Sequence, residues 1–294
     1  MATGMWTAVS GAKARTDQLD VVANNLANMD TVGFKKDSPT FKEYLAMHER
    51  EPSNFDIKLG PVKDKDFYPL DGRDQSFVIT DATYTNFKQG NLKVTHAPFD
   101  VALEGPGFLE VSTPQGVRYT RQGSLKVATD GRLVTPEGYP VLAAQPGGLA
   151  ATAQLAQTVQ PGQGGLLTQG GVAAGSEFRS INLKDRTPQI SISENGEIYA
   201  GEDLVAKLNV VEFKDSKKLR KQGGLLFENN DPTNVLTQVP QTLVRQGMLE
   251  TANVNPIEEM TNLIKANRLF EHDMKTLKTY NELLGKEAND IGKL

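Results

Sequence analysis

Residues 23–35 read ANNLANMDTVGFK, and the rest of the chain is organised around this stretch. Before it, apolar residues recur at alternating steps of three and four, which is typical of one apolar stripe along a helix, close to a coiled-coil seam. The stripe consists of Met5, Val9, Ala12, Leu19, Ala23 and Leu26. Asn28 and Asp30 favour turns, and Gly33 can adopt backbone angles that other residues avoid. We therefore expect a helix that ends in a defined turn.

A second helix with the same rhythm is expected at the end of the chain. Its stripe consists of Met260, Leu263, Phe270, Met274, Leu277 and Leu284, with Asn267 and Asn281 at two further positions. Pro256 suits the first turn of a helix, after Asn255 as a possible cap. At about 1.5 Å per residue the two helices would be roughly 35 and 40 Å long, which suits pairing with each other. Periodicity alone favours the plainer interpretation, two amphipathic helices packed on a globular core.

The two asparagines of the second stripe have two interpretations. A buried polar residue in a helical seam can fix the register and the oligomeric state at a cost in stability. The other interpretation is that both side chains contact solvent or a neighbouring subunit. The sequence leaves both interpretations open.

The middle of the chain predicts a mainly antiparallel β domain. In residues 81–246, short apolar segments alternate with turn residues about every ten positions. Asp130-Gly131 and Asn195-Gly196 are strong hairpin signals within it. Residues 143–178 differ, because they are rich in Gly, Ala and Gln with one charge, Glu177, and we expect a surface insertion there.

The overall prediction is an α+β chain whose two ends form one helical domain with a coiled-coil-like pairing. Residues 1–34 and 247–294 would be its two halves, and the β domain would be inserted between them. Residues 35–80 predict an extended connector, because Pro and Gly recur through them, with one further short helical turn possible around Phe41 to Leu45.

Composition argues against several classes of protein. The net charge of −4 gives no electrostatic case for binding nucleic acid or an anionic membrane. The chain has no cysteine, and its three histidines lie far apart, so neither a thiolate site nor a metal site is expected. No catalytic residues and no cofactor-binding motif are predicted. We also expect no membrane span and no cleaved signal peptide.

The opening motif resembles the N-terminal signature of flagellar rod and hook proteins, in which Ala-Asn-Asn-Leu-Ala-Asn is followed by a short spacer, Thr, any residue and Gly-Phe-Lys. The matching residues here include Asn24, Asn25, Leu26, Asn28, Thr31, Gly33 and Phe34. Residues 247–256, which read GMLETANVNP, and the helix that follows are similar to the C-terminal signature of the same family. The resemblance to the FlgF/FlgG rod proteins covers nearly the whole chain except residues 143–178. Residues 268–275, RLFEHDMK, look closer to the proximal rod type (FlgF) than to the distal type.

This resemblance implies a structural subunit of the bacterial flagellar basal-body rod and no enzymatic activity. The subunit would polymerise axially in the proximal rod and transmit torque from motor to hook, and the two apolar stripes would be its assembly seam. The implied partners are copies of itself, other rod proteins and the flagellar type III export apparatus, with no nucleic acid or lipid among them. The implied location is the rod, which spans the periplasm in a Gram-negative cell. A distal-rod or hook subunit of the same family is the alternative.

Overall fold

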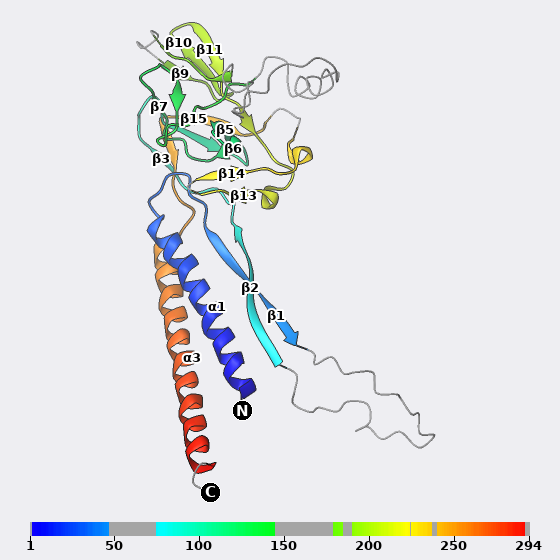
Figure 1. The fold of residues 1–294 in the computed structure, drawn as a ribbon. Helices are drawn as coiled ribbons and strands as arrows, with labels where there is room; N and C mark the ends of the chain where they lie inside the picture. Colours follow the sequence, from blue (N-terminus) through cyan, green and yellow to red (C-terminus); the bar gives the residue numbers. More distant parts are fainter. Residues whose placement is uncertain are drawn as a thin grey trace, which may run out of the picture. The chain divides into compact units, whose positions relative to one another are not determined.

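A computed structural model describes residues 2–46, 75–144, 179–184, 190–223, 225–236 and 240–291. The chain is α+β with mostly antiparallel strands and a helix near each end, which confirms the predicted fold class (Figure 1). It forms two compact units. The helical unit comprises Met1–Leu26, Asp37–Tyr84 and Pro256–Leu294, and the β unit comprises Ala27–Lys36 and Thr85–Asn255.

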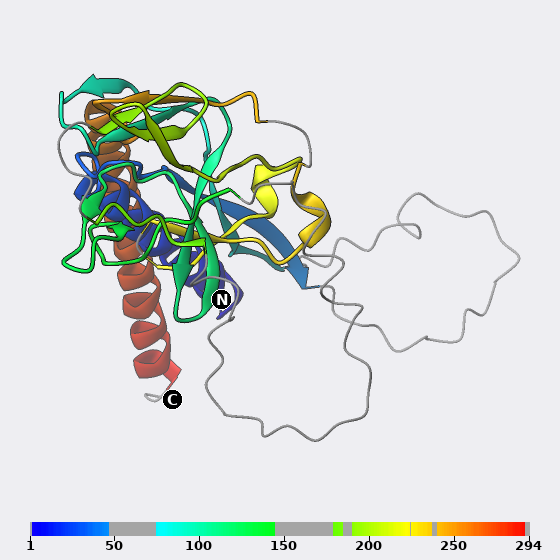
Figure 2. The ribbon, with the colours of Figure 1, turned by 90° about the horizontal axis from the view of Figure 1, so that it is seen from above.

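The helical unit contains both helices, α1 (Ala2–Ala27) and α3 (Pro256–Ile291). They lie side by side and run in opposite directions (Figures 1 and 2). Pro256 opens α3 as expected, and Glu258 and Glu259 occupy its first turn, where negative charge favours the helix dipole. The structure thus confirms the two helices, while a coiled-coil domain formed by them stays a prediction.

The same unit contains two long strands, β1 (Asp37–Ala46) and β2 (Gln75–Thr85), which form a two-stranded sheet. The helical turn considered around Phe41 to Leu45 is wrong, because these residues belong to β1. Pairing with β2 gives the backbone polar groups partners that an unpaired extended connector would lack. The middle of the predicted connector, residues 47–74, lies outside the described residues.

Short strands make up most of the β unit. They are β3 (Leu92–Val94), β4 (Val101–Glu104), β5 (Phe108–Thr113), β6 (Gly116–Thr120), β7 (Lys126–Val127), β8 (Leu133–Val134), β9 (Ile190–Ile192), β10 (Glu197–Ala200), β11 (Asp203–Lys207), β12 (Val210–Val211), β13 (Arg220–Lys221), β14 (Leu226–Glu228), β15 (Leu243–Gln246) and β16 (Met248–Glu250). Two 3-10 turns, η3 (Ser216–Lys218) and η4 (Pro232–Asn234), lie between them. The largest sheet has the order β12-β5-β6-β14-β13.

Both hairpin signals of the sequence are confirmed. Asp130-Gly131 connects the antiparallel pair β7 and β8, and Asn195-Gly196 connects β9 and β10. Gly131 and Gly196 have φ angles of 86° and 79°. Glycine adopts this conformation without the steric cost that a side chain would add.

The chain enters and leaves the β unit along paired strands. β3 pairs with β16, and β4 pairs with β15, all antiparallel. The segments that follow the first helix and precede the last one are therefore neighbours, although about 150 residues separate them in sequence. The N-terminal signature reaches the same region through its own contact, because the N–H of Gly33 donates to the carbonyl oxygen of Glu250 in β16 at 2.8 Å.

Two apolar clusters form the core of the β unit. The larger cluster contains aliphatic residues of both halves of the unit: Val101, Leu103, Leu109, Val111, Leu125, Leu133, Val141, Ile181, Leu183, Ile192, Ile198, Leu208 and Val244. The smaller cluster is built around Phe108, Phe213 and Phe227, whose rings meet edge to face at centroid distances of 5.5 and 5.8 Å. Of the predicted insertion 143–178, residues 145–178 lie outside the described part of the chain.

Candidate assembly site

The side chains of α1 that are buried are short. The buried residues are Ala12, Ala14, Val22 and Asn25. Among the residues of the predicted stripe, Ala12 is buried, Met5, Leu19 and Leu26 are half-buried, and Val9 and Ala23 are exposed. The predicted stripe of α1 is therefore divided between buried and exposed positions in the single chain, and as an assembly seam it stays a prediction.

On α3 the inward face shares only alternate positions with the predicted stripe. Leu263, Phe270, Leu277 and Leu284 are half-buried. The other inward positions are Glu259, Ala266, Asp273 and Tyr280, each one residue before a predicted stripe position. One residue is about 100° around a helix, so the remaining predicted positions turn outward. They are Met260, Asn267, Met274 and Asn281, and all four are exposed.

The two stripe asparagines are therefore solvent-exposed in the single chain. Asn267 donates a hydrogen bond from Nδ2 to Glu271 Oε1 at 3.4 Å, within the same helix. Of the two interpretations left open by the sequence, contact with solvent or with a neighbouring subunit fits this placement. A register-fixing role inside the helix pair does not.

Two contacts set the register of α1 against α3. Asn25 Nδ2 lies 3.4 Å from Glu259 Oε2, and a Cβ added at Gly11 would lie 3.5 Å from Asp273 Oδ2. Both contacts fit one antiparallel register, because the contacting residues are fourteen positions apart on each helix. These two contacts between the helices are made by small and polar residues, and they lie beside the half-buried apolar side chains on the inward face of α3.

An apolar stripe of α3 faces outward as a result. The outward stripe consists of Ile257, Met260, Ile264 and Met274, with exposed fractions of 78%, 49%, 52% and 47%. On α1, Trp6 and Val9 are exposed at 55% and 38%. Leaving these apolar side chains in water is unfavourable, so this face of α3 is a candidate interaction site.

Asn25 of the opening motif fixes the start of β1 to the end of α1. Its side-chain amide donates to the carbonyl oxygen of Asp37 at 2.8 Å and accepts from the backbone N–H of Asp37 at 3.0 Å. The side chain is 1% exposed. An amide satisfies both backbone groups at once because it carries a donor and an acceptor side by side. The neighbouring Asn24 lies on the exposed side of the helix.

The rest of the motif forms a tight turn in the β unit. Backbone N–H groups of Thr31 and Phe34 donate to the carbonyl oxygens of Asn28 and Thr31, and Thr31 Oγ1 donates to Asn28 Oδ1. Gly33 has a φ of 73°, and its N–H donates to the carbonyl oxygen of Glu250 at 2.8 Å. A Cβ at this position would lie 2.6 Å from the backbone carbonyl of Arg121. Glycine is therefore required here for both its backbone angle and its size.

Lys35, at the end of the motif, belongs to a buried network of charges that we call the motif network, formed by Lys35, Arg121 and Glu250. Lys35 Nζ donates to Glu250 Oε1 at 2.6 Å and to the carbonyl oxygen of Lys88 at 2.9 Å. Arg121 donates to Glu250 Oε2 at 3.3 Å and to the carbonyl oxygen of Gly105 at 2.7 Å. All three side chains are almost fully buried. One carboxylate thus joins the N-terminal signature, the C-terminal signature and the middle of the β unit.

Burial disfavours the charged forms of both Lys35 and Arg121. It lowers the pKa of Lys35 below its usual range, and the attraction of Glu250 opposes that shift. Burial lowers the pKa of Arg121 in the same way, with Glu250 and then Glu212 opposing it. Arg121 also stacks over the ring of Phe108, with its guanidinium carbon 4.7 Å from the ring centroid. Removing the carboxylate would leave two buried cations without their anion.

All three residues of the motif network stand in motifs that the sequence analysis singled out. The sequence alone does not show that their side chains contact one another. Lys35 and Glu250 each lie in a terminal signature, and Arg121 lies in the run Tyr119-Thr120-Arg121-Gln122-Gly123. More than 80 residues separate each of them from the next. The sequence signal for the motif network is that each of the three motifs contains one of these charged residues among residues typical of turns and strands.

The described residues contain no cluster of His, Cys, Asp and Glu that could hold a metal ion. Within the same part of the chain, neither helix is both long and apolar enough to cross a membrane.

Three family descriptions match this chain. Residues 5–35 match "Flagella basal body rod protein", residues 102–200 match "Flagellar hook protein FlgE/F/G D1 domain", and residues 245–291 match "Flagellar basal body rod FlgEFG protein C-terminal". The first and last matches contain the two signature motifs, which meet at the motif network.

Curated relatives are similar along their whole length. The flagellar basal-body rod protein FlgG of Buchnera aphidicola subsp. Schizaphis graminum is 28% identical over 298 residues, covering 97% of this chain and 98% of the relative. The rod protein FlgF of Caulobacter vibrioides is 28% identical over 296 residues and covers 100% of both chains. The FlgG protein of Borreliella burgdorferi is also 28% identical, with 98% of both chains covered. With matches in both terminal signatures and in the domain between them, the chain belongs to the FlgF/FlgG family of flagellar basal-body rod proteins.

Proposed function

We propose that this chain is a structural subunit of the flagellar basal-body rod, that it assembles with copies of itself and with other rod proteins, and that it transmits torque along the rod. The observation that carries this proposal is the outward stripe of α3 together with Trp6 and Val9 of α1. A helical tube needs contacts that repeat without closing on themselves, and exposed stripes on both terminal helices offer such contacts. No enzymatic activity, bound nucleic acid or lipid is part of the proposal.

The proximal rod is the position we propose within this assembly. Residues 268–275, RLFEHDMK, favour the FlgF type. The overall similarity favours neither type, because FlgG and FlgF relatives are both 28% identical. A distal-rod or hook subunit is the alternative, and labelling the protein in purified basal bodies separates the two. Label at the base of the rod supports the proximal assignment, and label next to the hook contradicts it.

The proposal also includes the domain roles expected from the sequence. Residues 1–34 and 247–294 would supply the rod contacts, residues 81–246 the β domain, and residues 35–80 the connection. The subunit would pass through the flagellar type III export apparatus without a cleaved signal peptide and reside in the periplasm-spanning rod.

The test of the assembly surface compares two substitutions on one helix. The double variant Met260→Ser and Ile264→Ser removes apolar area from the outward stripe, while Lys265→Ser removes a long exposed side chain beside it. We expect the double variant to lose swimming and rod assembly, with the purified monomer melting within a few degrees of the parent, because exposed positions contribute little to monomer stability. Lys265→Ser should swim normally.

Normal swimming of the double variant would contradict the assignment of the outward stripe. The half-buried positions Leu26 and Leu277 then become the surfaces to test. Leu→Asp at either position should abolish motility if the predicted stripes are the assembly seam, while the β unit still unfolds cooperatively.

A further inference from the structure

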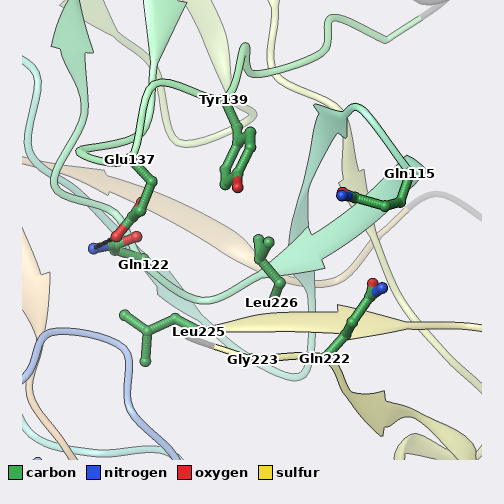
Figure 3. Close-up of a pocket in the computed structure, with 8 residues that line it drawn as sticks. All are labelled: Gln115, Gln122, Glu137, Tyr139, Gln222, Gly223, Leu225 and Leu226. Carbon is green, nitrogen blue, oxygen red and sulfur yellow. Dashed lines mark hydrogen bonds between the residues drawn. The ribbon is translucent and has the colours of Figure 1, made fainter. Parts of the chain in front are cut away.

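We propose that the β unit carries a binding site for one uncharged sugar ring of an oligosaccharide. The site is a cavity of about 300 Å³ (Figure 3). It is lined by Gln115, Gln122, Glu137, Tyr139, Gln222, Gly223, Leu225 and Leu226. This proposal goes beyond the structural role in the rod and does not depend on it.

The cavity has two polar ends with an apolar centre. Figure 3 shows Gln122 beside Glu137 at one end and Gln115 with Gln222 at the other. The ring of Tyr139 and the side chain of Leu226 lie between these ends. These side chains come from the β5–β6 turn, the segments that follow β6, β8 and β13, and strand β14. The fold has therefore assembled one polar–apolar–polar arrangement from several parts of the sequence.

Hydrogen bonds within the protein orient two of the amides. Arg118 Nε donates to Gln222 Oε1, so the NH₂ group of Gln222 remains available as a donor. Gln122 Nε2 donates to Glu137 Oε1 at 3.2 Å, so the Gln122 carbonyl oxygen and the second Glu137 oxygen remain acceptors. One end thus presents acceptors, and the other presents a donor.

Two further groups of the lining can both donate and accept hydrogen bonds. The side-chain amide of Gln115 and the hydroxyl of Tyr139 have no hydrogen-bond partner among the described residues. An amide carries two donors and an acceptor, and a phenol can donate and accept. A ligand that carries several hydroxyl groups can satisfy such a mixed set, because each hydroxyl also donates and accepts.

The apolar centre and the charge of the lining narrow the ligand class. A sugar ring carries hydroxyl groups at its edge and C–H groups on its faces, which matches polar ends around Tyr139 and Leu226. The lining contains no Lys or Arg, and its one charged residue is Glu137. Phosphates and acidic sugars would be repelled by this carboxylate, and Arg118, the cation that contacts the lining residue Gln222, is already paired with Glu228 at 3.2 Å.

Size and strand pairing argue against larger or peptide ligands. About 300 Å³ is at the lower end of ligand sites, which suits one ring. A peptide that binds as an added strand needs a free sheet edge, but β14 already pairs with β6 and β13. Strand β14, which contains Leu226, therefore has a paired strand on each side. A ligand in the cavity has to be bound by side chains.

The experiment titrates the full chain with chitotriose, cellotriose and maltotriose, and with trigalacturonic acid as the charged comparison, by NMR and calorimetry. We expect at least one neutral trisaccharide to bind with saturation in the millimolar range. Gln115→Ala should weaken that binding by about fivefold or more, the usual effect of losing one hydrogen bond. Gln241→Ala removes an exposed amide outside the cavity and should leave the affinity unchanged.

Four results would each overturn the proposal. No neutral sugar binds at about 20 mM, where a millimolar complex is nearly saturated. Trigalacturonic acid binds as tightly as the neutral sugars, or Gln115→Ala does not change the affinity. If the cavity signals instead shift with protein concentration alone, a segment of a second copy occupies the cavity and no sugar site exists. Retained swimming of Gln115→Ala would leave the rod function intact and separate the two proposals.

Discussion

The helical unit and the β unit differ in where they place their large apolar side chains. Among the described residues, fourteen large hydrophobic side chains are exposed, and only Val94 and Leu204 of these belong to the β unit. The buried apolar residues show the reverse distribution, since only Ala12, Ala14, Val22 and Ala266 come from the helical unit. The β unit therefore carries its own core, whereas the helical unit leaves apolar side chains exposed in the single chain.

This difference implies that the two units contribute differently to the stability of the monomer and to the proposed assembly. A helix gains little stability from propensity alone and depends on packing its apolar face. In the helical unit that packing is incomplete in the single chain. Substitutions in the β unit should consequently change the stability of the monomer, and substitutions on the exposed helix faces should change assembly.

The largest effect is expected at the motif network. Glu250→Gln keeps the size of the side chain but leaves Lys35 and Arg121 buried without an anion, which should cost about 3–5 kcal/mol in the free energy of unfolding. Urea unfolding of the full chain measures it. Glu197→Gln is the matched control, because Glu197 pairs with Lys207 at 3.4 Å on the exposed surface, where such a pair contributes about 1 kcal/mol or less. Equal effects at the two positions would show that the motif network does not hold the β unit together.

A core substitution compares the two units directly. Leu109 is fully buried in the larger cluster, so Leu109→Ala should lower the free energy of unfolding by about 3 kcal/mol through lost burial and a residual cavity. Met260→Ala on the outward stripe should change it by about 0.5 kcal/mol or less. Both values come from the same urea titration. A large loss of monomer stability for Met260→Ala would mean that the helical unit also carries a closed core.

A pair of glycine substitutions separates backbone strain from close packing. Gly33 and Gly201 have similar φ angles, 73° and 69°, but only Gly33 has backbone atoms near the added Cβ. Both alanine variants should lose about 1 kcal/mol from the backbone conformation. Gly33→Ala should lose about 1–2 kcal/mol more, because the carbonyl of Arg121 has to move. Thermal unfolding of both variants measures the difference, and equal losses would refute the packing argument.

The smallest effect is a pH dependence that arises at Tyr119 in the β unit. The pKa of Tyr119 is raised from 10.0 to about 12, mainly by burial and also by the negative charge of Glu110, while Arg179 opposes the shift. The unfolded chain releases this proton near pH 10 and the folded chain near pH 12. The stabilisation is therefore complete below pH 10 and is lost as the pH rises to about 12, by an amount on the order of 1–2 kcal/mol.

Tyr119→Phe is the measurement that isolates this group. Unfolding free energies of both proteins are measured at several pH values from 9 upward. The value for the parent should fall relative to that of the phenylalanine variant between pH 10 and about 12, because the variant lacks the ionisable hydroxyl. A constant difference over this range would show that the hydroxyl of Tyr119 titrates alike in the folded and unfolded states.

The sequence by itself determined the elements with strong local signals. The three-four repeats before Leu26 and after Pro256 specified both helices, and Asp130-Gly131 and Asn195-Gly196 specified two hairpin turns. The physical reason is that helix periodicity and left-handed turn residues act over a few neighbouring positions. The family followed from the signatures 23–35 and 247–256 in the same way, since each is a contiguous run.

Only the tertiary structure decided which helix faces are buried and which charges meet. Apolar periodicity assigned Met260 and Met274 to the stripe, but the structure turns the residues one position earlier inward. Glu259 lies beside Asn25 of α1, and Asp273 lies beside Gly11. The motif network required the N-terminal turn to pack on β16, where the N–H of Gly33 donates to the carbonyl oxygen of Glu250 and Lys35 Nζ lies 2.6 Å from its side chain across 215 residues. Such contacts depend on the path of the whole chain, because their energy exists only when distant segments are already in place.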